Sequence, residues 1–401
     1  MDLTLSRRAR ELREEVASFV ADRIIPAEAT YLAEVRASGR PHTPPPVLEA
    51  LKAEARAEGL WNLFMPDPDW GSGLSNLDYA PIAEETGRSL MAPEVFNCNA
   101  PDTGNMELLA RFGTSDQQDR WLVPLLEGRT RSCFAMTEPD VASSDATNVR
   151  STIEPRGDRL VVNGRKWFVT NAPREETAIC LFLGRSAEDG PAHGRHSIVL
   201  LPMDTKGITV ERTLSVFGYD FGEGHGALTF LDVDVPTSNL LGELGEGFAL
   251  AQARLGPGRI HHCMRLIGLA ERALTLLCRR AEEREAFGSR LTAHRNIQDW
   301  IAESRNDIEQ ARLLTLKAAW LMDTVGAREA RKEISMIKIV APRAALRVVD
   351  RAIQVHGATG VSQDTPLAHL YAHARTMRIV DGPDEVHLMS VARQELRSQL
   401  A

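Results

Sequence analysis

The residues that decide the fold are 134–145, Phe134-Ala135-Met136-Thr137-Glu138-Pro139-Asp140-Val141-Ala142-Ser143-Ser144-Asp145, because the pattern of apolar residues changes around them. Over residues 1–130 apolar side chains recur at the spacing of an α-helix, and over 131–240 they alternate as in β-strands. Helical spacing returns over 241–401. We therefore predict an α+β multidomain protein with an N-terminal helical domain (1–130), a middle antiparallel β domain (131–240) and a C-terminal helical domain (241–401).

Local signals place several elements within these domains. Ser6 is a suitable N-cap for a first helix, and Pro26 should end that helix because proline cannot continue the hydrogen-bond ladder. Asn163-Gly164 is a strong signal for a two-residue hairpin turn. Pro342 lies inside an apolar stripe and predicts either a kinked helix or two helices. Further short strands are predicted at 166–170, 178–183, 197–201, 208–211 and 227–233.

Two glycine clusters, 222–226 and 256–258, superficially suggest dinucleotide binding. Neither follows a strand within a βαβ unit, which argues against a Rossmann site, and the sequence contains no P-loop pattern. We interpret both clusters as turns and helix starts.

The composition narrows the functional classes. The chain has 47 Lys and Arg against 55 Asp and Glu, a net charge of −8, which disfavours binding to nucleic-acid phosphates. Its five cysteines are widely spaced and include no C-x-x-C pair, which indicates a reducing compartment without a disulfide frame or zinc site. The sequence shows neither a signal peptide nor an apolar run of membrane-spanning length. A cytoplasmic protein without a membrane partner is therefore predicted.

Four short segments combine residue types that suggest chemistry: 134–145, 166–171 (KWFVTN), 284–288 (REAFG) and 381–387 (DGPDEVH). Residues two apart on a strand share a face, so Phe168 and Thr170 should point one way and Trp167 and Val169 the other. An aromatic plane beside a hydroxyl could flank a flat heteroaromatic cofactor. The same pair is also common on any half-buried strand.

Taken together and in this order, the segments resemble the acyl-CoA dehydrogenase family, with supporting similarity at 11–28, 113–128, 229–248 and 354–360. The resemblance runs from about residue 10 to residue 395. It implies the family's fold, in which a C-terminal four-helix bundle follows the helical and β domains and FAD binds between the β domain and the bundle. It also implies a flavoenzyme of fatty-acid oxidation that converts an acyl-CoA to the trans-2-enoyl-CoA.

The resemblance further implies which residues hold FAD. The segment from Phe134 to Ser143 would line the flavin ring and the substrate thioester, and Phe168 and Thr170 would stack on the ring and hydrogen-bond it. Arg284 and Phe287 would reach the pyrophosphate and adenosine from a neighbouring subunit, which implies a homodimer or homotetramer. The implied cofactor residues are Phe134, Met136, Thr137, Ser143, Phe168, Thr170, Arg284, Phe287, His294, Gln354, Val355, Gly357, Ala358, Pro383 and Glu385. The implied substrate contacts are Ser143, Arg259 and Gly382.

The catalytic base of the family precedes a glycine after the last bundle helix and is usually Glu. Here that position is Asp381, before Gly382. Aspartate is one methylene shorter, so the backbone must approach the substrate more closely to compensate. Some family members place the base near this chain's residues 256–259 instead, where glycines offer no side chain. Asp384 and Glu385 are weaker candidates because their register lies beyond the usual position.

The whole string 381–387 resembles a branch of the family, some of whose members are fused to kinase-like domains, that handles long, branched or 4-hydroxylated acyl chains. We expect 401 residues to leave no room for such a kinase. The chain departs from the common family pattern at Asp140, Ala142, Arg295 and Ala372-His373. An electron-transferring flavoprotein is the implied electron acceptor.

Two other functions stay open at this point. Nitroalkane oxidases share the fold and use an aspartate base on a similarly acidic proton, but they pass the electrons to oxygen. Another branch of the fold binds DNA in stress responses with little turnover, which the net charge of −8 disfavours. The compound that bleaches the flavin, an acyl-CoA or a nitroalkane, would separate the two enzymes.

Overall fold

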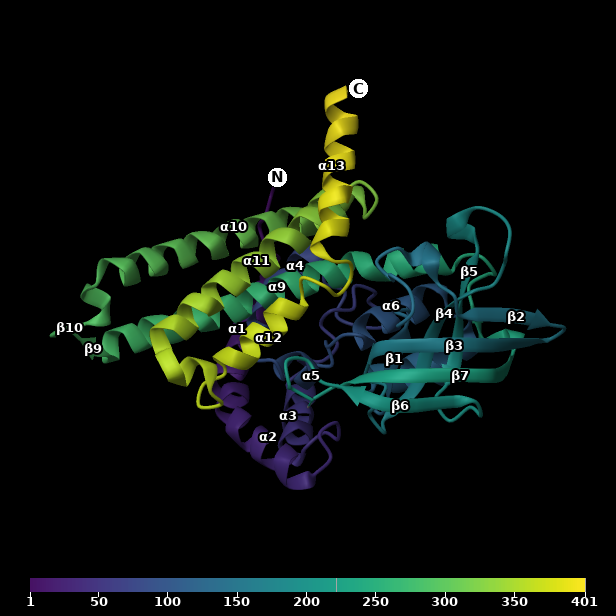
Figure 1. The fold of residues 1–401 in the computed structure, drawn as a ribbon, viewed down its shortest axis with the longest axis horizontal. Helices are drawn as coiled ribbons and strands as arrows, with labels where there is room; N and C mark the ends of the chain where they lie inside the picture. The colour runs from purple at the N-terminus through teal and green to yellow at the C-terminus, as the bar shows by residue number, and fades with distance from the viewer. Residues whose placement is uncertain (221, 401) are drawn as a thin grey trace. The chain divides into compact units, whose positions relative to one another are not determined.

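The computed structural model describes residues 1–220 and 222–400 (Figure 1). They form two compact units, each assembled from separate stretches of the chain. The first, here called the helical unit, comprises Met1–Pro26, Gly73–Pro93 and Gly256–Ala401, and the second, the sheet unit, comprises Ala27–Ser72 and Glu94–Leu255. The predicted order of helices, sheet and helices along the chain is confirmed. The domain boundaries near residues 130 and 241 stay predictions.

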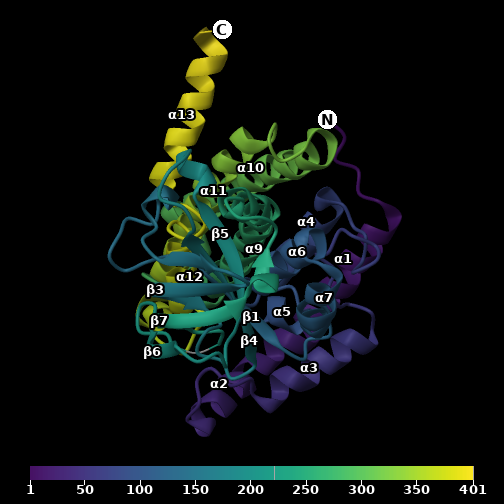
Figure 2. The same ribbon diagram turned by 90° about the vertical axis from the view of Figure 1, so that its right-hand side faces the viewer.

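The sheet unit is built on an eight-stranded sheet in the order β6-β7-β3-β2-β4-β5-β8, with β1 paired to β4. The strands are β1 (Arg131–Ala135), β2 (Thr152–Arg156), β3 (Arg159–Thr170), β4 (Thr177–Arg185), β5 (His196–Pro202), β6 (Ile208–Leu214), β7 (His225–Pro236) and β8 (Leu240–Leu241). The five further strands predicted from the sequence all lie within β3 to β7. Figure 2 shows β3, β7 and β6 side by side at one edge.

The sheet is mixed rather than purely antiparallel. The strand β1 pairs with β4 in parallel over five positions, and β2 meets β4 in parallel at one. The whole β2–β3 hairpin separates β1 from β4 in the sequence, which is enough chain for two strands to run in the same direction. Alternate apolar residues of the strands, among them Leu160, Val162, Phe182 and Phe230, form one buried cluster.

The hairpin turn predicted at Asn163-Gly164 is wrong. The β2–β3 turn is Gly157-Asp158, between the paired residues Arg156 and Arg159. Asn163-Gly164 lies inside β3, where the pairing with β7 shifts register. A Cβ on Gly164 would lie 2.1 Å from Ser151 Oγ, so this glycine serves a close approach within the sheet rather than a turn.

The first helix begins as predicted and continues beyond its predicted end. Helix α1 (Arg7–Phe19) is capped by Ser6, whose Oγ accepts from the Ala9 N–H at 3.1 Å. Pro26 does not end the helical run. A wider π-helical turn (Val20–Ile24), closed by a hydrogen bond from Ile25 N–H to the Val20 carbonyl, leads directly into α2 (Ile25–Ser38). The change of hydrogen-bond register lets the chain pass a proline that a regular α-helix would not accommodate.

The helical unit is dominated by three long helices. Its main elements are α1, α4 (Asn76–Thr86), most of α9 (Gly247–Glu283), α10 (Arg295–Val325), α11 (Arg331–His356), α12 (Leu367–Thr376) and α13 (Asp384–Leu400). The remaining helices of the chain are α3 (Pro46–Ala57), α5 (Ala92–Val95), α6 (Asp102–Phe112), α7 (Ser115–Gln117) and α8 (Val123–Leu126). In Figures 1 and 2 the C-terminal half of α13 extends beyond the other helices of its unit.

Helix α4 joins the C-terminal helices through close packing and ion pairs. A Cβ on Gly268 would lie 1.8 Å from the Glu84 carbonyl oxygen, so α9 can approach α4 only because the residue is glycine. Arg312 on α10 binds the buried Glu84 carboxylate with its Nη2 at 2.7 Å. The Asp323 carboxylate accepts the Leu77 N–H at 2.8 Å and so caps the start of α4. These contacts place an N-terminal helix with the C-terminal ones.

Two further helical predictions can be compared with the structure. The cluster 256–258 is neither a turn nor a helix start, because α9 runs through it with Pro257 inside. Pro342 lies within the single continuous helix α11, so that stripe is one helix and not two. Among the described residues, no helix combines the length and apolar character needed to cross a membrane.

Candidate active site

In the helical unit, Asp381 lies in the loop 377–383 that joins α12 to α13. Its φ is +55°, and Gly382 follows with a φ of +99°. A Cβ on Gly382 would lie 2.9 Å from His387 Nε2, so the close approach also requires glycine. Aspartate is one of the few residues that tolerate the left-handed region, and here it adopts that region beside a glycine.

Side chains from three helices bind the carbonyls of this loop. Lys338 Nζ on α11 donates to the Met377 and Val380 carbonyls at 2.8 and 2.9 Å. Arg259 Nε on α9 donates to the Asp381 carbonyl at 3.1 Å. His387 Nε2 on α13 lies 3.2 Å from the same oxygen, and because a carbonyl can only accept, Nε2 carries the proton. The backbone of Asp381 is therefore held from two sides.

Burial sets the charge of these groups. It lowers the pKa of Lys338 and of Arg259, while the nearby Asp381 raises both in compensation. Burial, followed by the charges of Arg259 and Lys338, lowers the pKa of His387 to about 4. His387 is thus neutral at pH 7, which suits a ring that donates to a carbonyl.

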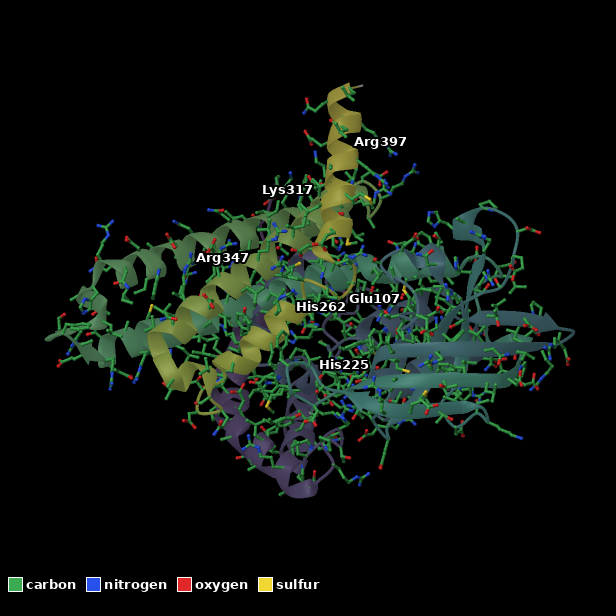
Figure 3. The ribbon with its side chains drawn as sticks, in the orientation of Figure 1. Glu107, His225, His262, Lys317, Arg347 and Arg397 are labelled. Atoms are coloured by element: carbon green, nitrogen blue, oxygen red, sulfur yellow. The ribbon has the colours of Figure 1, made fainter. Side chains whose placement is uncertain are left out.

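The Asp381 side chain faces α9. Its Oδ2 lies 3.4 Å from Nε2 of His262, and the two side chains are 21% and 17% exposed. Figure 3 shows His262 on α9 beside the loop that leads into α13. The sequence reasoning missed His262, although its position three residues after Arg259 on a helix could have indicated a shared face.

The two neighbouring carboxylates, Asp384 and Glu385, differ from Asp381 in burial and contacts. Asp384 is buried and accepts from Arg343 Nε at 3.0 Å and Arg378 Nη2 at 2.7 Å, so it ties the start of α13 to the unit. Glu385 is exposed in the first turn of α13. Asp381 is therefore the carboxylate of this loop that stays partly exposed, as a base would have to be to reach a substrate.

In the sheet unit, a buried ion pair supports the segment from Phe134 to Ser143. Lys166 Nζ donates to the Glu138 carboxylate at 2.9 Å and to the Met136 carbonyl at 3.0 Å. The Glu138 carboxylate also accepts the backbone N–H groups of Arg150 and Ser151. Burial lowers the pKa of Lys166 to about 8. Burial alone would raise the pKa of Glu138, but Lys166 and the N–H donors bring it below its ordinary value.

The ion pair shapes the loop on which the flavin residues were predicted. The Glu138 N–H donates to Ser143 Oγ at 2.9 Å, and the Trp167 N–H donates to the Thr137 carbonyl at 3.0 Å. Ser143 and Thr137 are thereby brought next to β3, which carries Phe168 and Thr170. Phe134 lies on β1 with its ring 4.4 Å from the Arg254 guanidinium.

Strand β3 does not alternate regularly at Phe168. The register with β7 shifts between Lys166 and Val169, and Phe168 has a φ of +50°. This bulge leaves the Phe168 side chain 44% exposed and its ring 5.9 Å from that of His225. Thr170 Oγ1 is 3.0 Å from Nδ1 of the same histidine. The prediction that Phe168 and Thr170 share a face by regular alternation is wrong, because the bulge adds one residue and changes which way the side chains point. Both residues instead lie next to His225.

His225 was missed because it lies within the glycine cluster 222–226. Burial, and then the charge of His42, lowers the pKa of His225 to about 4, so the ring is neutral at pH 7. Figure 3 labels it at the start of β7. A neutral imidazole can either donate to or accept from the Thr170 hydroxyl.

Arg284 and Phe287 lie on a small hairpin after α9. Its strands are β9 (Glu285–Ala286) and β10 (Ser289–Arg290), and the turn residues Phe287 and Gly288 have φ of +52° and +80°. Two successive positive φ values are typical of a tight hairpin turn. The Phe287 side chain is fully exposed, and His294 Nε2 lies 3.3 Å from the Ala286 carbonyl.

The other predicted cofactor residues of the helical unit lie at the end of α11 and the start of α13. Gln354 is exposed, Val355 is buried, and Gly357 ends the helix with a φ of +62° before Ala358. Pro383 immediately precedes α13. The hairpin with Arg284 is 25 residues along α9 from Arg259, or about 37 Å at 1.5 Å per residue. Arg284 and the predicted substrate contact Arg259 therefore lie at opposite ends of the part of α9 that belongs to this unit.

Fold and site together define a flavin-dependent oxidoreductase with the order helical domain, β domain, helical domain. Family models of the N-terminal, middle and C-terminal domains of acyl-CoA dehydrogenase match residues 6–129, 133–233 and 245–396. The chain belongs to the acyl-CoA dehydrogenase family, whose cofactor is FAD. The described residues contain no group of three or more His, Cys, Asp or Glu arranged to hold a metal ion.

Proteins similar in sequence and structure carry the name of the same family. The Mycobacterium tuberculosis protein named Probable acyl-CoA dehydrogenase FadE2 is 54% identical over 99% of this chain and 97% of its own length. Acyl-CoA dehydrogenase family member 11 of Gallus gallus is 53% identical over 98% of this chain, which spans 51% of that relative. A solved structure of a family protein from Mycobacterium abscessus has a TM-score of 0.96 and 50% identity, covering 99% of this chain and 100% of that one.

Proposed function

We propose that the chain is an FAD-dependent acyl-CoA dehydrogenase that converts an acyl-CoA thioester to the trans-2-enoyl-CoA, with Asp381 as the base. The observation that carries the proposal is the Asp381 loop. Its backbone is bound through the Met377, Val380 and Asp381 carbonyls, while the carboxylate itself stays partly exposed. The first chemical step of the family's reaction is removal of a proton, and a carboxylate held in this manner could act as the base for it.

The protein's task in this reaction is to take the proton from the carbon next to the thioester. Arg259 and Lys338 are buried cations near Asp381, and they favour its carboxylate form. The left-handed backbone of Asp381 and Gly382 offers a way to advance a side chain that is one methylene shorter than glutamate. Bound FAD would supply the acceptor for the hydride that leaves the neighbouring carbon.

The sheet unit presents groups that suit a flat, polar ring system. Phe168 is held at an unfavourable φ of +50° with its ring exposed, and Thr170 and His225 supply polar groups beside it. A bulky residue with positive φ is uncommon and points to a functional constraint. We assign the flavin ring to Phe168, Thr170 and the segment from Phe134 to Ser143, and the remainder of FAD to Arg284, Phe287, His294, 354–358, Pro383 and Glu385.

The spacing along α9 supports a homodimer or homotetramer, since Arg284 would then serve the cofactor of a neighbouring copy. A fully exposed Phe287 at a hairpin tip is consistent with burial against such a copy. An electron-transferring flavoprotein is proposed as the acceptor, and long, branched or hydroxylated acyl-CoAs as substrates. A monomer in solution that keeps FAD tightly bound would contradict the shared site.

The central experiment is anaerobic mixing with a panel of acyl-CoAs, followed by the loss of visible flavin absorbance. Asp381→Asn should keep bound FAD but reduce the flavin about 10²–10⁴-fold more slowly, the usual contribution of a general base. Glu395→Gln is a matched control, because Glu395 is an exposed carboxylate on α13 that pairs with Lys332. Undiminished reduction in Asp381→Asn would reject the assignment. Bleaching by a small nitroalkane and by no acyl-CoA would favour a nitroalkane oxidase.

A further inference from the structure

His262 and Asp381 face each other within the helical unit. The distance from His262 Nε2 to Asp381 Oδ2 is 3.4 Å, and both side chains are mostly buried. His262 lies on α9 one turn beyond Arg259, which itself binds the Asp381 carbonyl at 3.1 Å. One helix therefore contacts both the backbone and the carboxylate of the same residue.

The loop contacts hold the backbone of Asp381, whereas the contact with His262 is made by its carboxylate. Three residues, Lys338, Arg259 and His387, bind carbonyls of the loop and none of these bonds reaches the carboxylate. If the carboxylate rotates, the oxygen that must take the substrate proton does not keep one position. Misplacement of a reacting group by about 1 Å can cost on the order of 10²-fold in rate.

We propose that His262 is a positioning residue for the base, an inference that rests on the proposed function. The His262 Nε2–H donates to Oδ2 of Asp381, and Oδ1 takes the substrate proton. In the step, the C–H bond next to the thioester breaks, an O–H bond forms on Oδ1, and the electron pair of the broken bond forms the new C=C bond. Bound FAD would accept the hydride that leaves the next carbon. Oδ2 accepts from His262 before and after the transfer.

The charges around this pair decide its pH dependence. Arg259, His261 and Cys263 lie beside His262 on α9, Lys338 comes from α11, and Asp384 and His387 from α13. Burial keeps His261, Cys263 and His387 uncharged at pH 7. A donor to the carboxylate adds to the effect of the cations and favours the ionised base. Loss of the donor should therefore move the acidic limb of the rate profile to higher pH.

The test compares His262→Leu with His262→Gln, whose amide can still donate. The readouts are the anaerobic rate of flavin reduction by the best acyl-CoA from pH 5 to 9, and kcat and KM separately. We expect His262→Leu to keep FAD, to lose about 10- to 100-fold in kcat with little change in KM, and to shift its acidic limb upward. His262→Gln should recover most of the rate. His193→Leu is the control, since that histidine is exposed in the sheet unit and stacks on Phe248.

The outcomes separate this inference from the function it rests on. A His262→Leu protein with the wild-type rate and pH profile would overturn the positioning role while leaving the dehydrogenase assignment intact. A His262→Gln protein no faster than His262→Leu would also overturn it, because a donor would then not suffice. If the wild-type flavin is reduced by no acyl-CoA, the proposed function fails first. Should His262→Leu fold poorly, the rate and profile of His262→Gln alone decide, and a loss of over 10-fold there contradicts the proposal.

Discussion

The loop around Asp381 in the helical unit and the bulge around Phe168 in the sheet unit are built alike. Each holds a residue other than glycine at positive φ, each contains a buried lysine that donates to two carbonyls, and each has a histidine whose pKa burial lowers to about 4. Lys338 donates to Met377 and Val380, and Lys166 to Met136 and Leu183.

The difference lies in how each lysine's charge is balanced. Lys166 has its own buried carboxylate, Glu138, at 2.9 Å. Lys338 donates to carbonyl oxygens, and Asp381 is the first acidic group that raises its pKa. In the Lys166–Glu138 pair the two charges compensate each other, so the pair holds its loop with little effect on other groups. Lys338 is bound by uncharged carbonyl groups, so its positive charge also acts on the nearby Asp381 carboxylate. The first arrangement suits a scaffold, and the second favours the ionised form of Asp381, the proposed base.

The largest effect is expected from Lys166→Met, because it leaves Glu138 charged and buried without its partner. We expect a loss of about 3–5 kcal/mol in the free energy of unfolding, measured with denaturant. Adding Glu138→Gln in the same chain removes the uncompensated charge and should restore part of the loss. If the double variant were no more stable than the single one, the pair would not be a closed ion pair.

Lys338→Met should cost less stability and more activity. Two carbonyls lose a buried donor, which we expect to cost about 2–3 kcal/mol. The loop carrying Asp381 should loosen, so flavin reduction by acyl-CoA falls about 100-fold while FAD stays bound. Lys332→Met on the same helix is the control, because that lysine pairs with Glu395 at the surface and should cost under about 1 kcal/mol. Equal activity in Lys338→Met and Lys332→Met would show that Lys338 does not hold the Asp381 loop in place for the reaction.

The effect that is smallest at pH 7 concerns acid sensitivity, where the two regions should behave alike. Burial lowers the pKa of His225 and of His387 to about 4, so between pH 6.5 and 4 the unfolded chain binds protons that the folded chain does not. Stability is then complete above pH 6.5 and falls as the pH drops toward 4, by up to about 3 kcal/mol for each histidine. His225→Gln and His387→Gln should each flatten this fall in urea titrations at pH 7, 5.5 and 4.5. Parallel curves for wild type and variants would reject the role of these histidines.

Several features were readable in the sequence because they depend on neighbours along the chain. Ser6 caps α1 as predicted, since an N-cap needs only the next turn of helix. The strands within 166–233 followed from alternation, and Asp381 before Gly382 was indicated by the resemblance to the family. The acyl-CoA dehydrogenase family was likewise recognisable from segments in their order, and the family models confirm it.

Other features depend on partners far away in the sequence. Asn163-Gly164 has the composition of a turn, yet Gly164 meets Ser151 inside the sheet. Pro26 should have ended a helix, but a π turn carries the chain past it. Phe168 leaves the expected alternation because the pairing of β3 with β7 shifts there. His262 and His225 gained a role only from what stands opposite them, Asp381 and Thr170.

The sequence by itself determined the order of helical and strand segments, the family, and the carboxylate that precedes the glycine at 382. These follow from local periodicity and from residue types at fixed spacing, which survive without any knowledge of packing. Only the tertiary structure decided that α4 joins the C-terminal helices, which carbonyls the two buried lysines bind, and that a histidine faces Asp381. Such contacts join residues up to hundreds of positions apart, and no pattern along one strand or helix encodes them.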